Sequence, residues 1–367
     1  MKVTKYISIA LMAAFAFALD SCKNGNPEFS DYEGGSSVYF ARQHVVRNVV
    51  LGNDETRDNT DDNNHVFYIV STMGGTYHGR DITLETAVDN SLCDRLYFED
   101  GVTPVKPMPA NYYSIPSTTV SYNGSFQGRL QVKLEDAFFN DPASVTGTYV
   151  IPIVIKGQVG ADRILSGTPA IEGSTPSRTN AAAWNVAPKD YVLYCVKYMN
   201  PWSGYYLRSG EDKITHNGNT ETKIRKGASV EKNEVCQITT KSLKECIFPV
   251  SINKTVKDAH GNDVVQAVTC RLKLSFDDNG NCAVSSETSG MTATGTGKFT
   301  SKGATNEKAW GGKNRDLLTL EYRIDFGGGL TMESKDEFVA QTRATRMAWL
   351  SSSRSISKFR SKVISVI

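Results

Sequence analysis

The sequence predicts a two-domain, all-β protein, and three observations support this prediction. Short runs of β-branched and aromatic residues are separated by clusters of Gly, Asn, Asp and Pro. The run from Val268 to Phe276 alternates apolar and polar residues, which is the period of a strand with one buried face. No stretch of convincing length has a helical period. Residues 22–367 are numerous enough for two domains that each bury a core.

The first domain is predicted over residues 36–165. It contains seven candidate strands: Val38–Ala41, Val45–Leu51, Val66–Ser71, Ile82–Val88, Thr118–Tyr122, Arg129–Leu134 and Tyr149–Ile155. Seven short strands within about 120 residues favour a sandwich of immunoglobulin type. Pro152 cannot donate to a strand ladder, so its strand is predicted to lie at a sheet edge or to carry a bulge.

Residues 166–189 are dense in Ser, Thr, Pro, Gly and Ala, which predicts a linker with Trp184 attaching it to a domain. The second domain is predicted over residues 190–342. Its candidate strands are Asp190–Asn200, Pro201–Gly210, Glu234–Thr239, Cys246–Ile252, Val268–Phe276, Gly297–Thr300, Leu317–Asp325 and Leu330–Glu333. The turn at Asp277–Asn281 and the antiparallel order favour a second sandwich or a small barrel.

The N-terminus reads as a lipoprotein signal peptide, residues 1–21, followed by a polar tether, residues 22–35. Lys2 and Lys5 precede an apolar run, Tyr6–Leu19, whose 14 residues are too few to cross a bilayer. The run ends in Leu-Asp-Ser-Cys, which resembles a bacterial lipobox and makes Cys22 the predicted lipidation site. An ordinary cleaved signal, with Cys22 incidental, is the alternative.

Charge and cysteine content exclude several classes of protein. Loss of residues 1–21 changes the 41 basic and 39 acidic residues to 39 and 38, a net charge of +1 that does not suggest a nucleic-acid partner. The six cysteines other than Cys22 contain no C-x-x-C pair and are predicted to be core residues. Cys236 and Cys246 could face each other across a hairpin, and buried thiols are favoured over a disulfide. Residues 343–367 form a basic tail, predicted to be solvated, with a membrane or anionic-glycan contact as the alternative.

No motif for catalysis, metal or cofactor is found. The chain lacks H-E-x-x-H and G-x-S-x-G, and its five histidines show no paired spacing. Residues 290–299 superficially resemble a phosphate loop but have Phe299 where Ser or Thr is needed. The acidic segment from Asp54 to Asn64 could offer oxygen ligands to calcium, but a solvated loop is favoured because it lacks the EF-hand order. Catalytic residues, metal ligands and cofactors are therefore all predicted to be absent.

Two aromatic groups are candidates for sugar binding. Aromatic rings stack on pyranose rings, while Asn, Asp and Arg bind hydroxyl groups. Trp202, Tyr205 and Tyr206 cluster beside Arg208, and Trp310 lies in a Gly- and Lys-rich loop. These five residues are the predicted ligand-binding set. The alternative is that they are core residues, as most Trp and Tyr in β domains are.

Four short patterns resemble a Bacteroidota lipoprotein family: the lipobox, Pro109–Tyr113, Gly147–Pro152 and Pro201–Leu207. Members of this family pair two domains of unknown function, and many are encoded in polysaccharide-utilisation loci. The resemblance implies an immunoglobulin-like first domain, a second domain of sandwich or lipocalin-like type, and glycan capture at the outer membrane. Surface-displayed relatives carry acidic residues directly after the cysteine, so Lys23–Pro27 leaves the cell-surface and periplasmic faces both open.

We therefore expect a non-catalytic lipoprotein that is attached to the outer membrane through lipid on Cys22 and binds a polysaccharide or other glycan. A structural, adhesion or assembly protein with an outer-membrane protein partner is the first alternative, because an edge strand could meet a partner chain. A glycan-cleaving hydrolase is the second, because a β fold can bring distant carboxylates together without a local motif.

Overall fold

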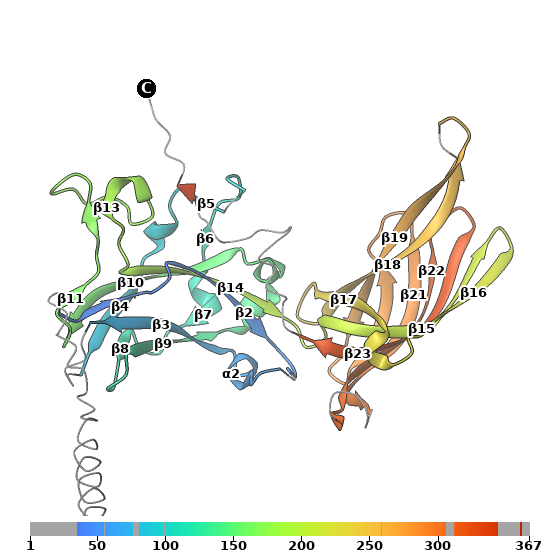
Figure 1. The fold of residues 1–367 in the computed structure, drawn as a ribbon, viewed down its shortest axis with the longest axis horizontal. Helices are drawn as coiled ribbons and strands as arrows, with labels where there is room; N and C mark the ends of the chain where they lie inside the picture. The colour runs from blue at the N-terminus through green and yellow to red at the C-terminus, as the bar shows by residue number, and fades with distance from the viewer. Residues whose placement is uncertain are drawn as a thin grey trace, which may run out of the picture.

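The structure, a computed structural model, describes residues 35–54, 56–75, 81–98, 100–257, 259–305, 312–343 and 360–361. It confirms the all-β prediction: a two-sheet sandwich is followed by an antiparallel barrel (Figure 1). The signal peptide, Cys22, most of the tether and Trp310 lie outside the described residues. No helix in the described ranges is long and apolar enough to cross a membrane.

The sandwich consists of two sheets with a shared core. One sheet has the order β11 (Arg163–Ile164), β1 (Ser37–Tyr39), β3 (Val66–Gly74), β9 (Gln127–Leu134) and β7 (Tyr113–Ser114). The other has the order β2 (His44–Val50), β14 (Tyr191–Met199), β10 (Tyr149–Val159), β4 (Thr83–Val88) and β8 (Thr119–Ser121), with β6 (Lys106–Pro107) on β10. Each of the seven predicted runs overlaps one of these strands, because alternating or continuous apolar residues mark a buried strand face.

Short elements fill the connections. They are α2 (Thr60–Asn63), α3 (Asp136–Asn140), η1 (Asn90–Cys93), η2 (Ala110–Tyr112), η3 (Pro142–Val145), η4 (Ala181–Ala183), η5 (Val230–Lys232) and the strand pairs β12 (Thr168–Pro169) with β13 (Trp184–Val186) and β5 (Leu96–Tyr97) with β24 (Arg360–Ser361). The segment around η1 and β5 covers the outer face of β10 and β14. Residues such as Leu92 and Phe98 pack there against Val150 and Leu193.

Strand β14 corrects the predicted domain boundary. Residues 190–199 were assigned to the second domain, but β14 pairs with β10 and β2 in the centre of a sandwich sheet. Its residues are buried on both faces, by the sandwich core on one side and by the η1 segment on the other. The domains therefore meet at Asn200–Pro201. The predicted linker is attached to the sandwich by Arg178, which forms a bidentate pair with the buried Asp190, while Trp184 Nε1 donates to Ser177 O at 3.0 Å.

Strand β10, which contains Pro152, meets the second of its two predicted alternatives, because it is central in its sheet and carries a bulge. The Pro152 carbonyl accepts from Asp89 N at 2.9 Å, just beyond the last residue of β4. The N–H and C=O groups of one strand residue point to the same neighbouring strand. The N–H that Pro152 lacks would therefore point toward Asp89, at the end of the ladder between β10 and β4, so only one terminal hydrogen bond is lost. The bulge in β10 lies between Ile155 and Gly157.

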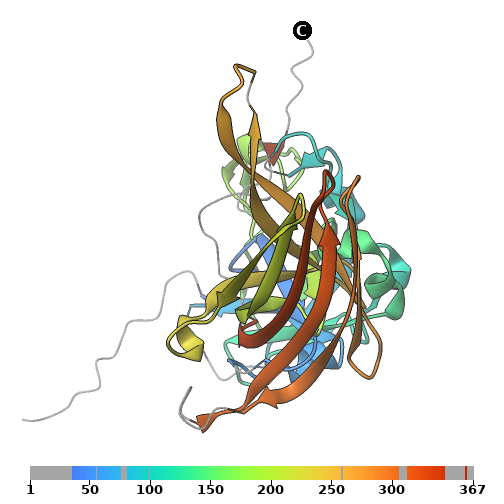
Figure 2. The same cartoon turned by 90° about the vertical axis from the view of Figure 1, so that its right-hand side faces the viewer.

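The second domain is a barrel that closes by pairing its first strand with its last. Its sheet has the order β16 (Asn219–Arg225), β15 (Gly204–His216), β17 (Glu234–Thr240), β18 (Glu245–Lys257), β19 (Asp263–Phe276), β20 (Asn281–Ser286), β21 (Thr292–Ala304), β22 (Arg315–Asp325) and β23 (Leu330–Thr342). Pairing of β15 with β23 closes the ring (Figures 1 and 2). On its other edge β15 pairs with β17 along its first half and with β16 along its second half. The predicted turn is present, with Gly280 at a φ of 79°.

The cysteines in the described ranges are free thiols. Register explains why Cys236 and Cys246 do not face each other: Cys246 lies opposite Thr240 on β17 and Leu274 on β19, whereas Cys236 lies opposite Tyr206 on β15. Burial raises the pKa of both Cys236 and Cys246 to about 12, which disfavours the reactive thiolate.

Candidate functional site

The predicted aromatic cluster begins at the entrance to the barrel, where Trp202 and Tyr206 are only 9% and 2% exposed. Trp202 stacks on Phe276, with ring centroids 4.4 Å apart. The Tyr206 hydroxyl donates to the Trp202 carbonyl at 2.7 Å. Both rings are thus committed to the barrel core and have no face available for a sugar.

Arg208 is buried as well, inside the barrel. Its guanidinium donates through Nε and Nη2 to one carboxylate oxygen of Asp336, at 3.0 and 2.8 Å, and lies over the rings of Phe248 and Phe338. The Tyr322 hydroxyl donates to the same Asp336 oxygen at 2.8 Å. Although burial alone would lower it, the neighbouring Tyr322 and Asp336 hold the pKa of Arg208 above its usual value.

A second arginine completes this buried network. Arg225, from strand β16, donates to both oxygens of Asp212 at 2.8 and 2.6 Å and to Asp336 Oδ1 at 2.6 Å. Ser334 donates to Asp212 at 2.7 Å. Burial would raise the pKa of Asp212, but the hydrogen bonds from Arg225 and Ser334 hold it below its usual range. Two guanidinium groups thus balance two carboxylates.

These contacts correct the predicted ligand-binding set. Trp202, Tyr206 and Arg208 are structural residues of the barrel core. Tyr205 is half-buried, on the opposite face of β15 from Tyr206. Trp310 lies outside the described residues.

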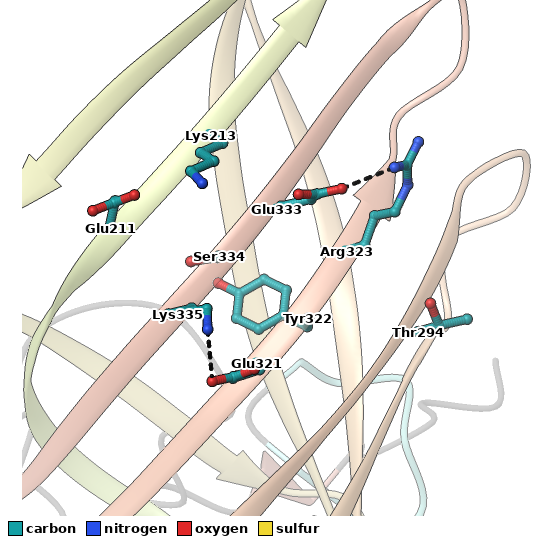
Figure 3. Close-up of a pocket in the computed structure, with 9 residues that line it drawn as sticks. All are labelled: Glu211, Lys213, Thr294, Glu321, Tyr322, Arg323, Glu333, Ser334 and Lys335. Carbon is teal, nitrogen blue, oxygen red and sulfur yellow. Dashed lines mark hydrogen bonds and ion pairs between the residues drawn. The ribbon is translucent and has the colours of Figure 1, made fainter.

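A different set of polar side chains gathers on the outer face of the barrel, across β15, β23, β22 and β21 (Figure 3). Two adjoining hollows there have volumes of about 300 and 490 Å³ and share Glu211, Glu321 and Lys335. We call this surface the outer groove. Its charged exposed residues in Figure 3 are Glu211, Lys213, Glu321, Arg323, Glu333 and Lys335.

Strand register arranges these charges in two rows of alternating sign. In one row Lys335 lies between Glu211 and Glu321, and in the next Glu333 lies between Lys213 and Arg323. Lys335 and Glu321 are 3.1 Å apart, and Arg323 and Glu333 are 3.0 Å apart. The second hollow adds two acids, Asp336 and Glu337, and two bases, Arg225 and Lys226. With five acids and five bases, the groove has no net charge while remaining rich in hydrogen-bonding groups.

The sequence contains a signal for the outer groove that is not one of the known catalytic or binding motifs. An acid and a base two residues apart occur in β15, β22 and β23, as Glu211/Lys213, Glu321/Arg323 and Glu333/Lys335. Residues two apart share a strand face, and antiparallel neighbours bring opposite charges together. The pairing of β15 with β23 joins residues more than a hundred positions apart, so no local pattern reveals it.

The acidic segment of the first domain is solvated only in part, because Asp58 and Asp61 are exposed while two other aspartates are buried. Asp54 and Asp62 are 7% and 1% exposed. Arg57 lies 3.1 Å from Asp54 and 3.0 Å from Asp62, and Arg47 also pairs with Asp62. Within the described residues no group of three or more His, Cys, Asp or Glu side chains could hold a metal ion.

Comparison with known proteins shows the family. A solved protein of unknown function from Bacteroides ovatus is 39% identical, with a TM-score of 0.75, over 85% of this chain and 96% of the other. The chain belongs to this Bacteroidota two-domain family of unknown function. Residues 201–344 of this member match the domain of unknown function DUF5627, and residues 32–162 match a model described as an N-terminal domain.

These matches fit the geometry of the family member described here. The DUF5627 match begins at Pro201, where the barrel begins, and the N-terminal match covers most of the sandwich. Two weaker structural matches are an auxiliary nutrient binding protein from Bacteroides thetaiotaomicron and a multidomain protein including DUF1735 from Bacteroides ovatus. Both are 12% identical to this chain. The nutrient binding protein covers 80% of this chain and 90% of its own, with a TM-score of 0.38. The multidomain protein covers 83% of this chain and 93% of its own, with a TM-score of 0.39. Likeness at this level carries no argument about function. A search of curated proteins finds no match.

Proposed function

We propose that this protein is a non-catalytic lipoprotein that binds a neutral polysaccharide in the outer groove of its barrel while lipid on Cys22 holds it at the outer membrane. The observation that carries the binding proposal is the neutral, alternating array of carboxylate, ammonium and guanidinium groups in an open hollow. The anchor is supported by the lipobox-like end of the signal peptide.

A polyhydroxylated ligand suits this surface for two reasons. Carboxylates accept from sugar hydroxyls, and Lys and Arg donate to them, so a row of mixed charges can contact consecutive sugar units. Because the charges cancel within the groove, a neutral glycan meets no excess charge on that surface. The hollow is open, which lets a polymer pass through it where an enclosed pocket would admit only a chain end.

The groove is a poor setting for glycoside hydrolysis. A hydrolase needs a carboxyl group whose pKa is raised, by an apolar pocket or a neighbouring acid, so that it can protonate the leaving oxygen. The carboxylates of Glu211, Glu321 and Glu333 are instead exposed, and each faces Lys or Arg across the strands. Binding without cleavage is the chemistry that this arrangement favours.

Affinity electrophoresis against a panel of neutral plant and host polysaccharides would test the binding site. The double variant Glu211→Gln/Glu321→Gln keeps the shape of both side chains and removes two charged acceptors. We expect a loss of affinity of about tenfold to a hundredfold for any retarding polysaccharide, because hydrogen bonds to charged groups contribute about 1.5–3 kcal/mol. Glu172→Gln, an exposed site in the sandwich domain, is the matched control and should bind like the unmodified protein. Retardation by none of the glycans, or equal retardation of the groove variant, would contradict the proposal.

The anchor is tested separately by fractionating cells that express the full chain. Cys22→Ser removes the thiol that would carry lipid, so we expect the protein to move from the membrane pellet to the soluble fraction. Metabolic labelling with a fatty-acid analogue should mark the unmodified chain and not the variant. An unlabelled chain that stays in the pellet would show that something other than this lipid holds it there.

A further inference from the structure

Strand β16 is an unprotected edge. Among the described residues it pairs only with β15, from His216–Asn219 to Gly210–Arg225. Its residues from Asn219 to Ile224 are exposed, and Ile224 is 72% exposed. It contains no Pro, Gly or bulge, the devices that commonly stop an edge from pairing with another chain.

The hairpin turn decides which backbone groups of β16 remain available. Asn217 and Gly218 both have positive φ, 50° and 85°, as in a two-residue type I′ turn, whose closing pair is hydrogen-bonded. His216 and Asn219 form that pair, so Asn219, Glu221, Lys223 and Arg225 direct their N–H and C=O groups to β15. Thr220, Thr222 and Ile224 therefore direct theirs toward the free edge.

The sequence of β16 is complementary to itself in one antiparallel register. If two copies meet with Thr222 opposite Thr222, Glu221 of each copy lies opposite Lys223 of the other. Thr220 then lies opposite Ile224. The facing residues Thr222/Thr222 and Thr220/Ile224 are those whose backbone groups point to the free edge, so each such pair can exchange two hydrogen bonds.

We infer that β16 is the interface between two copies of this chain, which pair antiparallel about a two-fold axis at Thr222. The pairing would join the two barrels through one continuous sheet. In such an isologous contact the free edge of each copy is occupied by the other copy, so the pairing cannot propagate into a fibre.

Three neighbouring registers, with axes at Glu221, Lys223 and Ile224, are disfavoured by charge. An axis at Lys223 places that lysine opposite its own copy, and an axis at Glu221 does the same for the glutamate. An axis at Ile224 places Lys223 opposite Arg225 twice. Like charges directly opposite destabilise a strand pair, whereas opposite charges stabilise it. A lysine on an edge strand ordinarily discourages pairing with another chain. Of these registers, only the one with Thr222 opposite Thr222 places Glu221 opposite Lys223 and so neutralises that lysine.

Both charged side chains are available for this contact. Within the described part of the chain neither Glu221 nor Lys223 forms an ion pair, and both are exposed. One strand pair buries less surface than a permanent dimer requires, so the association should be weak and depend on concentration.

Sedimentation velocity of the protein without its signal peptide, over a range of concentrations, tests the interface. We expect a monomer–dimer equilibrium that Glu221→Lys or Lys223→Glu weakens by about tenfold or more. Mixing the two single variants should restore association, because each Lys of one then faces a Glu of the other. Glu172→Lys in the sandwich domain is the matched control and should dimerise normally. A monomer at all concentrations, or a mixture that does not recover, would overturn the inference.

A substitution that removes a backbone N–H group tests the interface independently of charge. Thr222→Pro removes an N–H that the monomer does not use in its pairing with β15, so the barrel should fold and the dimer should be lost. Circular dichroism and thermal melting of each variant establish that its barrel is intact. A folded Thr222→Pro protein that still dimerises normally would place the interface elsewhere.

Discussion

At the scale of single residues, His44 makes stability depend on pH. It begins β2, and burial lowers its pKa from 6.5 to about 4. Between these values the unfolded chain binds a proton that the folded chain does not, so stability falls as pH falls through this window. The difference corresponds to at most about 3 kcal/mol between pH 7 and pH 4.

We therefore expect His44→Gln to flatten the decline in the free energy of unfolding between pH 7 and pH 4, measured by urea titration at each pH. The variant keeps a polar side chain of similar length but cannot be protonated. An unchanged slope in His44→Gln would mean that other groups dominate acid unfolding.

At the scale of elements, the buried charge network ties β16 and β15 to β22 and β23. Arg208→Met fills similar volume but leaves Asp336 buried with less compensation. Breaking one side of a buried ion pair costs about 3–5 kcal/mol, whereas replacing both sides with apolar residues can be nearly neutral. Arg208→Met should thus destabilise the barrel strongly, and Arg208→Met/Asp336→Leu should destabilise it less than the sum of the single changes.

A double-mutant cycle by chemical denaturation measures that coupling. Arg225 also contacts Asp336, at 2.6 Å, so removal of the aspartate leaves Arg225 with Asp212 and Ser334. Additive effects of the two changes would show that Arg208 and Asp336 do not act as a pair.

The elements that the sequence predicted best are those with a simple apolar pattern. Alternation marked β9 and β19, and continuous apolar residues marked β10. Strand β16 was not predicted, because its exposed residues carry no buried face for a pattern to record. The linker composition drew the boundary too early, since β14 belongs to the sandwich through partners distant in sequence.

The candidate site was difficult to predict for the same reason, because sequence patterns do not show which distant residues become neighbours. Trp202 and Tyr206 are large enough to bind a sugar or to fill a core, and composition alone does not distinguish these uses. The outer groove depends on the register between β15, β22 and β23, which follows only from barrel closure. The sequence shows the repeated spacing of acid and base within each strand, but it does not show which strands pair with one another.

At the scale of the whole molecule, Arg343 joins the two domains. The residue was predicted to begin a solvated tail, yet it is only 5% exposed and follows the last barrel strand, β23. It donates to the carbonyl of Leu51 in the sandwich at 2.8 Å and to those of Asn200 and Pro201 at the junction. Burial lowers the pKa of its guanidinium, so these carbonyls offset the cost of a charge removed from water.

Arg343→Met should therefore loosen the junction as well as destabilise the chain. The change leaves three carbonyls without this donor, and we expect a loss of about 3 kcal/mol in the free energy of unfolding, since each unsatisfied buried group costs about 1–3 kcal/mol. Limited proteolysis should then cleave near Asn200–Pro201 and release the barrel from the sandwich. Arg323→Met, at a 56% exposed arginine on the barrel surface, is the matched control and should change stability little. Equal protease resistance in the Arg343 variant would show that other contacts at Asn200 hold the domains together, such as its side-chain bonds to Ser242 and Glu245, both 2.9 Å.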